Sequence, residues 1–178
     1  MFREMRRKRQ LLPPEESVAI LERMTNGTLA LHGDDDYPYA VPVSYVYIDG
    51  RIYFHCAMKG HKVDAIMQNA KVSFCVVERD DIKPAEFTTY FRSVIIFGKA
   101  HILTDEAGKR AVLKLLADKY SHGEPGWEAE IDKDFNHLLI VEIDIEHMTG
   151  KESIELVREK KTTSPSGCTR IGSSISNG

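Results

Sequence analysis

The feature that most constrains this chain is a succession of short β-prone segments without regular helical crossovers between them. Between two of these segments, Val46 to Ile48 and Ile52 to Phe54, lies the dipeptide Asp49-Gly50, followed by Arg51. This dipeptide is the strongest hairpin signal in the chain, because the tightest hairpin turns need positive φ angles that Asp and Gly tolerate. Neighbouring strands joined in this way must run antiparallel.

Six strands are expected, and β-branched and aromatic residues are enriched in each of them. Their bounds are 28–32, 39–48, 52–54, 71–78, 91–103 and 138–145. Helical spacing of apolar residues predicts three helices, which begin near Pro14, His61 and Thr104. The pattern predicts a mostly β fold, an antiparallel β-barrel with appended helices, in place of a doubly wound sheet.

Length and composition fit one small globular domain. The chain has 178 residues, of which 42% are hydrophobic and 29% charged. We assign residues 1–160 to the domain and expect 161–178 to be a disordered tail, because small polar residues dominate there. No run of about 18 apolar residues occurs, so no membrane partner is expected.

Charge and cysteine content narrow the class of protein further. The net charge of −3 argues against a nucleic-acid partner, since nucleic-acid-binding domains are usually basic. The three cysteines include no CxxC pair, which disfavours a disulfide framework or a zinc knuckle and predicts a cytoplasmic location.

The N-terminus carries a basic arm, formed by Arg3, Arg6, Arg7, Lys8 and Arg9. A secretory signal would continue with an apolar stretch, whereas prolines and glutamates follow here. Two interpretations remain open: a solvated arm, or an arm that contacts a phosphate group or a partner subunit.

Common catalytic signatures are missing from the sequence. It contains no GxGxxG, GxxxxGK[ST], GxSxG or HExxH motif, and its histidines have no metal-ligand spacing, so no metal is expected. A Ser-His-Asp arrangement stays open, because such triads assemble in space and not along the sequence.

Gly60-His61-Lys62 is the most informative short stretch, because it follows a strand and opens a helix. Free backbone N–H groups at a helix start favour an anion, and Lys62 adds a donor suited to phosphate. The alternative is an ordinary exposed basic helix start. His55 and Cys56 lie on the preceding strand, six residues before the turn, so His55 could line the same site. Arg92 and Ser93, taken alone, are typical of an ordinary strand opening.

Three stretches together resemble a known family. They read VPVSYVYIDGRIYFHCAMKGHKVDAIMQNAKVSFCV, YFRSVIIFGKAHIL and LLIVEIDIEHMTGKES. In order and spacing they resemble the pyridoxamine-phosphate-oxidase-like split-barrel flavoproteins, and most of all the branch with the nitroimidazole-resistance (Nim-type) reductases. The resemblance spans about Met5 to Arg158.

The resemblance implies a six-stranded FMN-binding split barrel and a homodimer with flavin at the subunit interface, FAD being the alternative cofactor. It implies that one strand follows the flavin ring, that a turn holds the phosphate, and that other residues complete the pocket. The implied cofactor-binding residues are Val41, Pro42, Val43, Ser44 and Tyr45 along the ring, His55 and Cys56 beside it, His61 and Lys62 at the phosphate, and Arg92, Ser93 and Lys151 around the pocket.

The implied activity is an FMN-dependent oxidoreductase that reduces a small nitro-aromatic acceptor, with His55 as the catalytic residue. The alternatives are a non-catalytic flavin-binding protein that stores or senses the cofactor, and a pyridoxamine 5'-phosphate oxidase. True oxidases of that last kind have Arg-Lys where this chain has His61-Lys62, which argues against vitamin B6 oxidation.

Overall fold

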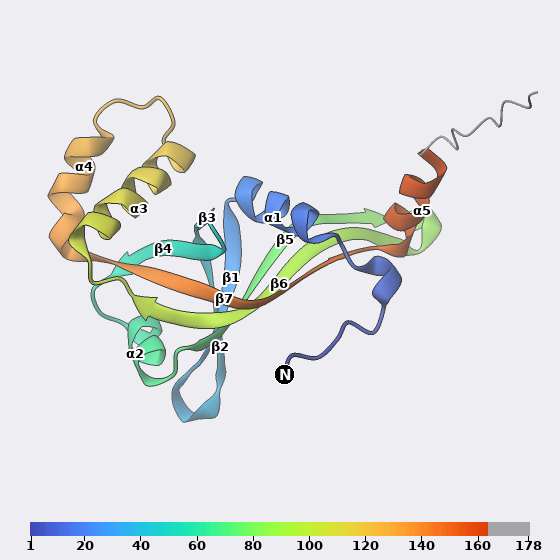
Figure 1. Ribbon diagram of the computed structural model, residues 1–178, viewed down its shortest axis with the longest axis horizontal. Helices are drawn as coiled ribbons and strands as arrows, with labels where there is room; N and C mark the ends of the chain where they lie inside the picture. Colours follow the sequence, from blue (N-terminus) through green and yellow to red (C-terminus); the bar gives the residue numbers. More distant parts are fainter. Residues whose placement is uncertain (164–178) are drawn as a thin grey trace, which may run out of the picture.

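The computed structural model describes residues 1–163 and consists of one antiparallel sheet with helices around it (Figure 1). The strand order is β2-β1-β5-β6-β7-β4-β3. The strands are β1 (Asn26–His32), β2 (Pro38–Ser44), β3 (Val46–Ile48), β4 (Arg51–Ala57), β5 (Lys71–Lys83), β6 (Thr88–Ile102) and β7 (Leu138–Glu152). The helices are α1 (Pro14–Arg23), α2 (His61–Gln68), α3 (Glu106–Tyr120), α4 (Trp127–Asp134) and α5 (Ile154–Thr163).

The mostly β fold is confirmed, but the sheet has seven strands and not six. The segment expected as one strand at 39–48 is divided at Tyr45 into β2 and β3. These two strands stand at opposite ends of the strand order, so the chain crosses from one edge of the sheet to the other at Tyr45. The main chain therefore connects the two edge strands of the sheet directly, as in a split barrel.

The hairpin predicted at Asp49-Gly50 is confirmed. Both residues have positive φ angles, 46° and 82°, and Ile48 pairs with Arg51 across the turn. The turn thus sets the register of β3 against β4, which places the side chains of β4 for the site described below.

Apolar side chains fill the barrel in a main cluster to which α1 contributes Ile20 and Leu21, both fully buried. A second cluster joins β3 and β4 to Val112, Leu113 and Leu116 of α3. Among residues 1–163, no helix is long and apolar enough to cross a lipid bilayer.

Several boundaries differ from the expected ones. The side chain of Asp105, not Thr104, caps α3 by accepting a hydrogen bond of 2.6 Å from the Gly108 N–H. Helices α4 and α5 were not predicted, because their sequences are rich in charged residues and contain few apolar ones. The tail expected at 161–178 lies outside the described residues except for 161–163, which end α5.

Three long strands dominate the sheet: β5 and β7 continue past their expected ends, and β6 begins three residues before its expected start. The pairing of β6 with β7 shifts by one residue between Phe97 and Gly98, as expected of a bulge. A Cβ atom at Gly98 would lie 2.3 Å from the carbonyl oxygen of Asp144, closer than any normal contact. Gly98 therefore permits a close approach of the two backbones.

We expect Gly98→Ala to destabilise the fold by about 1–3 kcal/mol, because the backbone of β7 must move to admit the methyl group. Denaturant unfolding would measure the change. Lys99→Ala, at the exposed neighbouring position, is the control and should change stability by less than about 0.5 kcal/mol. Equal stability of the two variants would show that the bulge has no steric requirement for glycine.

Candidate functional site

The residues that the sequence singled out fall into two groups and one strand. The first group lies where β4 leads into α2 and contains His55, Cys56, His61 and Lys62. The second group contains Arg92 and Ser93, near the start of β6, and Lys151, near the end of the neighbouring strand β7. The residues Val41, Pro42, Val43 and Ser44 belong to β2.

The start of α2 has the features of an anion site. Gly60 precedes the helix with a φ of 134°, and a Cβ atom there would have no neighbour within 4 Å. Within residues 1–163 the N–H groups of His61 and Lys62 have no hydrogen-bond acceptor, whereas those of Val63 and Asp64 bond to the Gly60 carbonyl. Free N–H groups and the positive end of the helix dipole favour a bound anion at this point.

Side chains around the helix start are held by aromatic neighbours. The Lys62 ammonium lies 5.4 Å from the centre of the Phe54 ring. The His61 ring stacks on Tyr39 of β2 at 4.2 Å, and its Nε2 atom lies 3.7 Å from a carboxylate oxygen of Asp34. The stack links α2 to β2, so the two elements that the family resemblance assigns to the flavin are adjacent in one chain.

The charge of Lys62 affects the pKa values of the two titratable residues at the end of β4, His55 and Cys56. The pKa of His55 is lowered, first by partial burial and then by repulsion from Lys62. Burial raises the pKa of the Cys56 thiol, and Lys62 partly offsets this effect. A lowered pKa keeps the His55 imidazole mostly neutral near neutral pH, so one ring nitrogen can donate a hydrogen bond and the other can accept one.

Strand β2 offers a free edge. It pairs with β1 on one side and is the last strand in the order on the other side. Along it, Val41 and Val43 face the core, whereas Pro42 and Ser44 are exposed. The backbone groups on the free edge are therefore open to a planar ligand that forms hydrogen bonds.

Tyr45 differs from its neighbours on β2. Its side chain is fully buried, and its hydroxyl donates to the Leu21 carbonyl at 2.9 Å. Its backbone N–H donates to the Tyr120 hydroxyl at 2.8 Å, and its carbonyl accepts from the same hydroxyl at 2.8 Å. The polar groups of Tyr45 thus serve the closure of the barrel.

Arg92, in the second group, is surrounded by carboxylates. It forms ion pairs with Glu16 of α1, Glu78 of β5 and Glu152 of β7. Ser93 pairs with Lys151 across the β6–β7 ladder, and the Lys151 ammonium lies 5.1 Å from the Phe91 ring centre.

The two groups are far apart in one chain. His55 pairs with Ile140 near the start of β7, whereas Ser93 pairs with Lys151 near its end. Residues 140 to 151 of a strand span roughly 35 Å at about 3.3 Å per residue. Figure 1 shows β7 running from the α4 end of the molecule to the α5 end. One small ligand therefore cannot contact both groups of the same chain.

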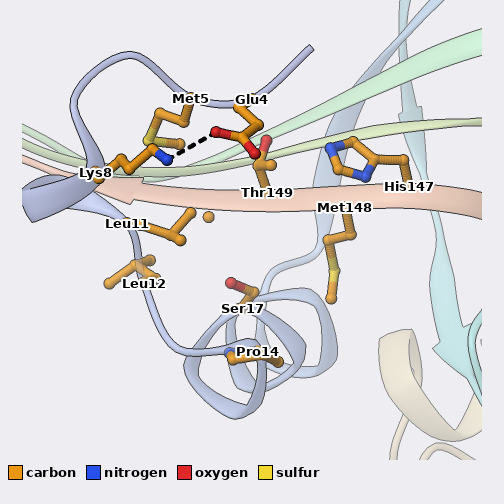
Figure 2. Close-up of a pocket in the computed structure, with 11 residues that line it drawn as sticks. Glu4, Met5, Lys8, Leu11, Leu12, Pro14, Ser17, His147, Met148 and Thr149 are labelled. Atoms are coloured by element: carbon orange, nitrogen blue, oxygen red, sulfur yellow. Dashed lines mark ion pairs between the residues drawn. The ribbon is translucent and has the colours of Figure 1, made fainter. Parts of the chain in front are cut away.

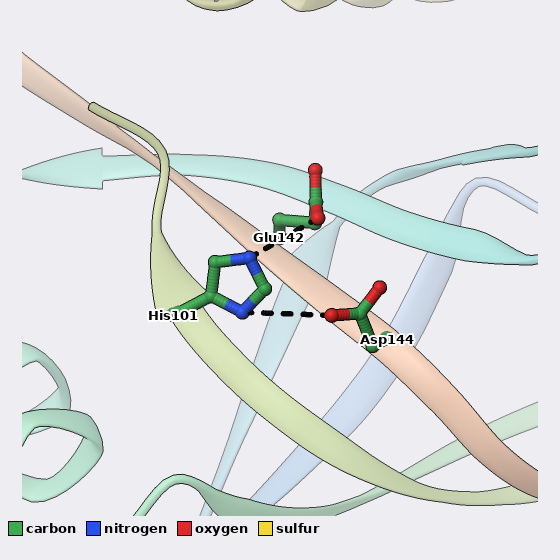
Figure 3. Close-up of side chains that lie close together, drawn as sticks. All are labelled: His101, Glu142 and Asp144. Atoms are coloured by element: carbon green, nitrogen blue, oxygen red, sulfur yellow. Dashed lines mark hydrogen bonds and ion pairs between the residues drawn. The ribbon is translucent and has the colours of Figure 1, made fainter. Parts of the chain in front are cut away.

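A separate cluster joins His101 of β6 to Glu142 and Asp144 of β7 (Figure 3). The His101 ring nitrogens lie 3.1 Å from Glu142 and 3.8 Å from Asp144. Arg51 of β4 pairs with the same two carboxylates, at 3.4 Å and 2.7 Å. Because the Arg51 guanidinium already pairs with both carboxylates, the cluster acts as a polar network that ties three strands together.

Sequence reasoning missed three contributors to these surroundings: Tyr39, which stacks on His61, Asp34, which faces it, and Tyr120, which holds Tyr45. No local sequence signal marks them, because each acts on a residue distant in the sequence.

Comparison with known proteins agrees with this architecture. An uncharacterised protein of Rhizobium meliloti (strain 1021) is 28% identical over 127 residues, which cover 66% of this chain and 78% of that protein. A FAD-binding protein of Mesorhizobium loti has a similar structure, with a TM-score of 0.61, 25% identity, and coverage of 81% of this chain and 97% of that one.

A Bacteroides thetaiotaomicron protein to which 5-nitroimidazole antibiotic resistance has been ascribed shares the fold. Its TM-score is 0.69 at 18% identity, covering 80% of this chain and 86% of that one. The model of the pyridoxamine 5'-phosphate oxidase family matches residues 13–152. The match extends over well more than half of the sequence, so this chain belongs to the pyridoxamine 5'-phosphate oxidase family.

Proposed function

We propose that this protein binds FMN and uses it as an oxidoreductase. The observation that carries the proposal is the start of α2, where free N–H groups and Lys62 lie and where His61 stacks on Tyr39 of β2, a strand with a free edge. This arrangement fits a ligand that joins a phosphate to a flat, hydrogen-bonding ring. The Mesorhizobium loti protein with a similar structure is FAD-binding, which supports a flavin as the ligand class.

Each element has a distinct part in this proposal. The N–H groups of His61 and Lys62 and the Lys62 ammonium hold the phosphate, and backbone groups of Val41 to Ser44 orient the ring. His55 and Cys56 lie beside the ring. A bound flavin supplies two-electron or hydride transfer, while the protein supplies binding, orientation and access. The carboxylate of Asp34, which lies 3.7 Å from His61, would repel a second phosphate on that side, which favours FMN over FAD.

The separation of the two groups supports a homodimer. If Lys62 and Lys151 serve the same flavin, they come from different subunits. The outer face of the sheet suits such an assembly, since Val77, Ile95 and Phe97 are 52%, 42% and 40% exposed on neighbouring strands. Apolar side chains gathered on a sheet face are typical of protein interfaces. We therefore propose two flavin sites, each built from both subunits.

The proposed acceptor is a small nitro-aromatic molecule, with His55 as the group that donates a hydrogen bond or a proton to it. The support is the fold shared with the Bacteroides protein and the position of His55 beside the phosphate site. A flavin-storing or flavin-sensing protein remains the second candidate, because the exposed His55 and the half-buried Cys56 would suit a binding role equally well. Cys56 and Cys75 are free thiols, which agrees with the proposed cytoplasmic location.

The cofactor proposal predicts that the purified protein is yellow and binds about one flavin per chain. Lys62→Ala should weaken FMN binding by roughly 10- to 150-fold, the effect of losing a charge-assisted hydrogen bond worth about 1.5–3 kcal/mol. Riboflavin, which lacks the phosphate, should lose little affinity. Fluorescence titration of both ligands measures the difference, and Lys59→Ala on the preceding loop is the matched control. A colourless protein that takes up no added FMN would rule out the proposal.

The interface proposal predicts complementation between two defective chains. Lys62→Ala and Lys151→Ala should each bind FMN poorly. When they are co-expressed, random pairing should restore about a quarter of the sites, because a mixed dimer has one intact site and one doubly altered site. Lys62→Ala co-expressed with the double variant is the control and should restore none. Absence of recovery in the first mixture would mean that each site is built within a single chain.

The reaction proposal predicts a role for His55 that can be followed without knowing the electron donor. The bound flavin is reduced with dithionite, and its anaerobic reoxidation by 2-methyl-5-nitroimidazole is measured. If the His55 imidazolium donates the proton, the rate should fall as pH rises through its lowered pKa, and His55→Gln should remove this dependence while flavin stays bound. Reoxidation no faster than that of free FMN would favour storage or sensing.

A further inference from the structure

The N-terminal arm, residues 1–13, is a strap attached to the sheet at both ends. At its start the Phe2 ring stacks on His147 with centroids 4.8 Å apart, and on Phe97 at 5.6 Å. At its end the Leu12 N–H donates to the Gly150 carbonyl at 3.0 Å, and Leu11 forms a bridge with Lys151. The intervening residues cross over β7 between these two attachments.

A cavity of about 410 Å³ lies between this strap, β7 and α1 (Figure 2). Its walls are mostly apolar: Met5, Leu11 and Leu12 come from the strap, Pro14 from α1 and Met148 from β7. Gly150 brings these walls together, because a Cβ atom there would lie 2.1 Å from the Ser17 hydroxyl. The volume falls within the range of small-molecule sites.

The polar groups around the cavity define what it can hold. Its two charged residues, Glu4 and Lys8, pair with each other at 2.7 Å, as Figure 2 shows, so together they add no net charge to the cavity wall. The Ser17 hydroxyl donates to the Pro13 carbonyl and keeps its acceptor capacity. His147 contributes a ring nitrogen. A charged ligand would therefore have no partner unless it broke the Glu4–Lys8 pair, whereas an uncharged ligand leaves the pair intact.

The two methionines in the cavity wall favour an aromatic ligand. Met5 and Met148 come from the strap and from β7, and thioether sulfurs make favourable contacts with aromatic rings. The strap itself can open, because the Glu4 and Lys8 side chains are 81% and 75% exposed and their ion pair contributes little stability.

We propose that this cavity binds a small uncharged aromatic molecule with one polar atom, and that the N-terminal strap is its lid. None of the residues assigned to the flavin lines the cavity, so its occupation requires no cofactor. The site thus gives the basic arm a function different from phosphate recognition.

The test uses the full-length protein with ¹³C-labelled methionine methyl groups and indole as the probe. The six methionines provide internal controls, since Met58 and Met67 are exposed and lie elsewhere. Indole should shift the methyl signals of Met5 and Met148 through its ring current and leave those of Met58 and Met67 unchanged. Indole-3-acetate, the same ring with a carboxylate, should bind at least about 10-fold more weakly, since its charge would have no partner unless it broke the ion pair within the strap.

Variants separate the cavity from other surfaces. Leu11→Trp fills the cavity from the half-exposed strap and should abolish the Met148 shift, whereas Ile82→Trp at an exposed position should not. Phe2→Ala frees the start of the strap and should speed indole release, seen as faster exchange of the Met148 signal. The proposal is overturned if indole shifts no cavity methionine, if indole-3-acetate binds equally well, or if Leu11→Trp binds as the control does. Unchanged release in Phe2→Ala would reject the lid. Flavin binding is measured separately, so its failure does not bear on these outcomes.

Discussion

The closure of the barrel depends on how Tyr45 is held. At this residue the chain leaves the pairing of β2 with β1 and enters the pairing of β3 with β4. The Tyr120 hydroxyl bonds both backbone groups of Tyr45, and the buried ring meets Phe74 edge-on at 5.1 Å. The Lys119 ammonium lies 4.7 Å from the same ring, and burial lowers its pKa. Helix α3 thus holds the chain where it passes from one edge strand to the other, and a polar network of this kind favours one arrangement because its groups are hydrogen-bonded.

The candidate site is a consequence of this closure. Because the chain turns at Tyr45, β2 ends with a free edge, and β4 returns beside β7 with His55 and Cys56 at its end. Helix α2 then begins directly after β4, and the stack of His61 on Tyr39 brings it back to β2. The order of the strands therefore brings the start of α2 close to β2, although the two are well separated in sequence.

Local chemistry made the hairpin and the start of α2 predictable from sequence. Asp49-Gly50 and Gly60 act through their own backbone angles, so neighbouring residues were sufficient to identify them. The division at Tyr45 was not predictable, because its partners Leu21 and Tyr120 are 24 and 75 residues away. The cavity under the strap escaped prediction for the same reason: its walls come from residues 4–17 and 147–150, which only the fold brings together.

The environment of Arg92 changes the role that it can have. Its guanidinium has three carboxylate neighbours, and Glu152 is only 4% exposed. Lys160 of α5 also pairs with Glu16 and Glu152, so α1, β6, β7 and α5 meet in one ionic cluster. Removing one member of a buried ion pair costs about 3–5 kcal/mol, since the remaining charges lose their partner. An arginine engaged in this way holds elements together and has little positive charge left for a phosphate. Lys151, which forms no ion pair within residues 1–163, is therefore the better candidate for the cation that a second subunit would contribute to the proposed flavin site.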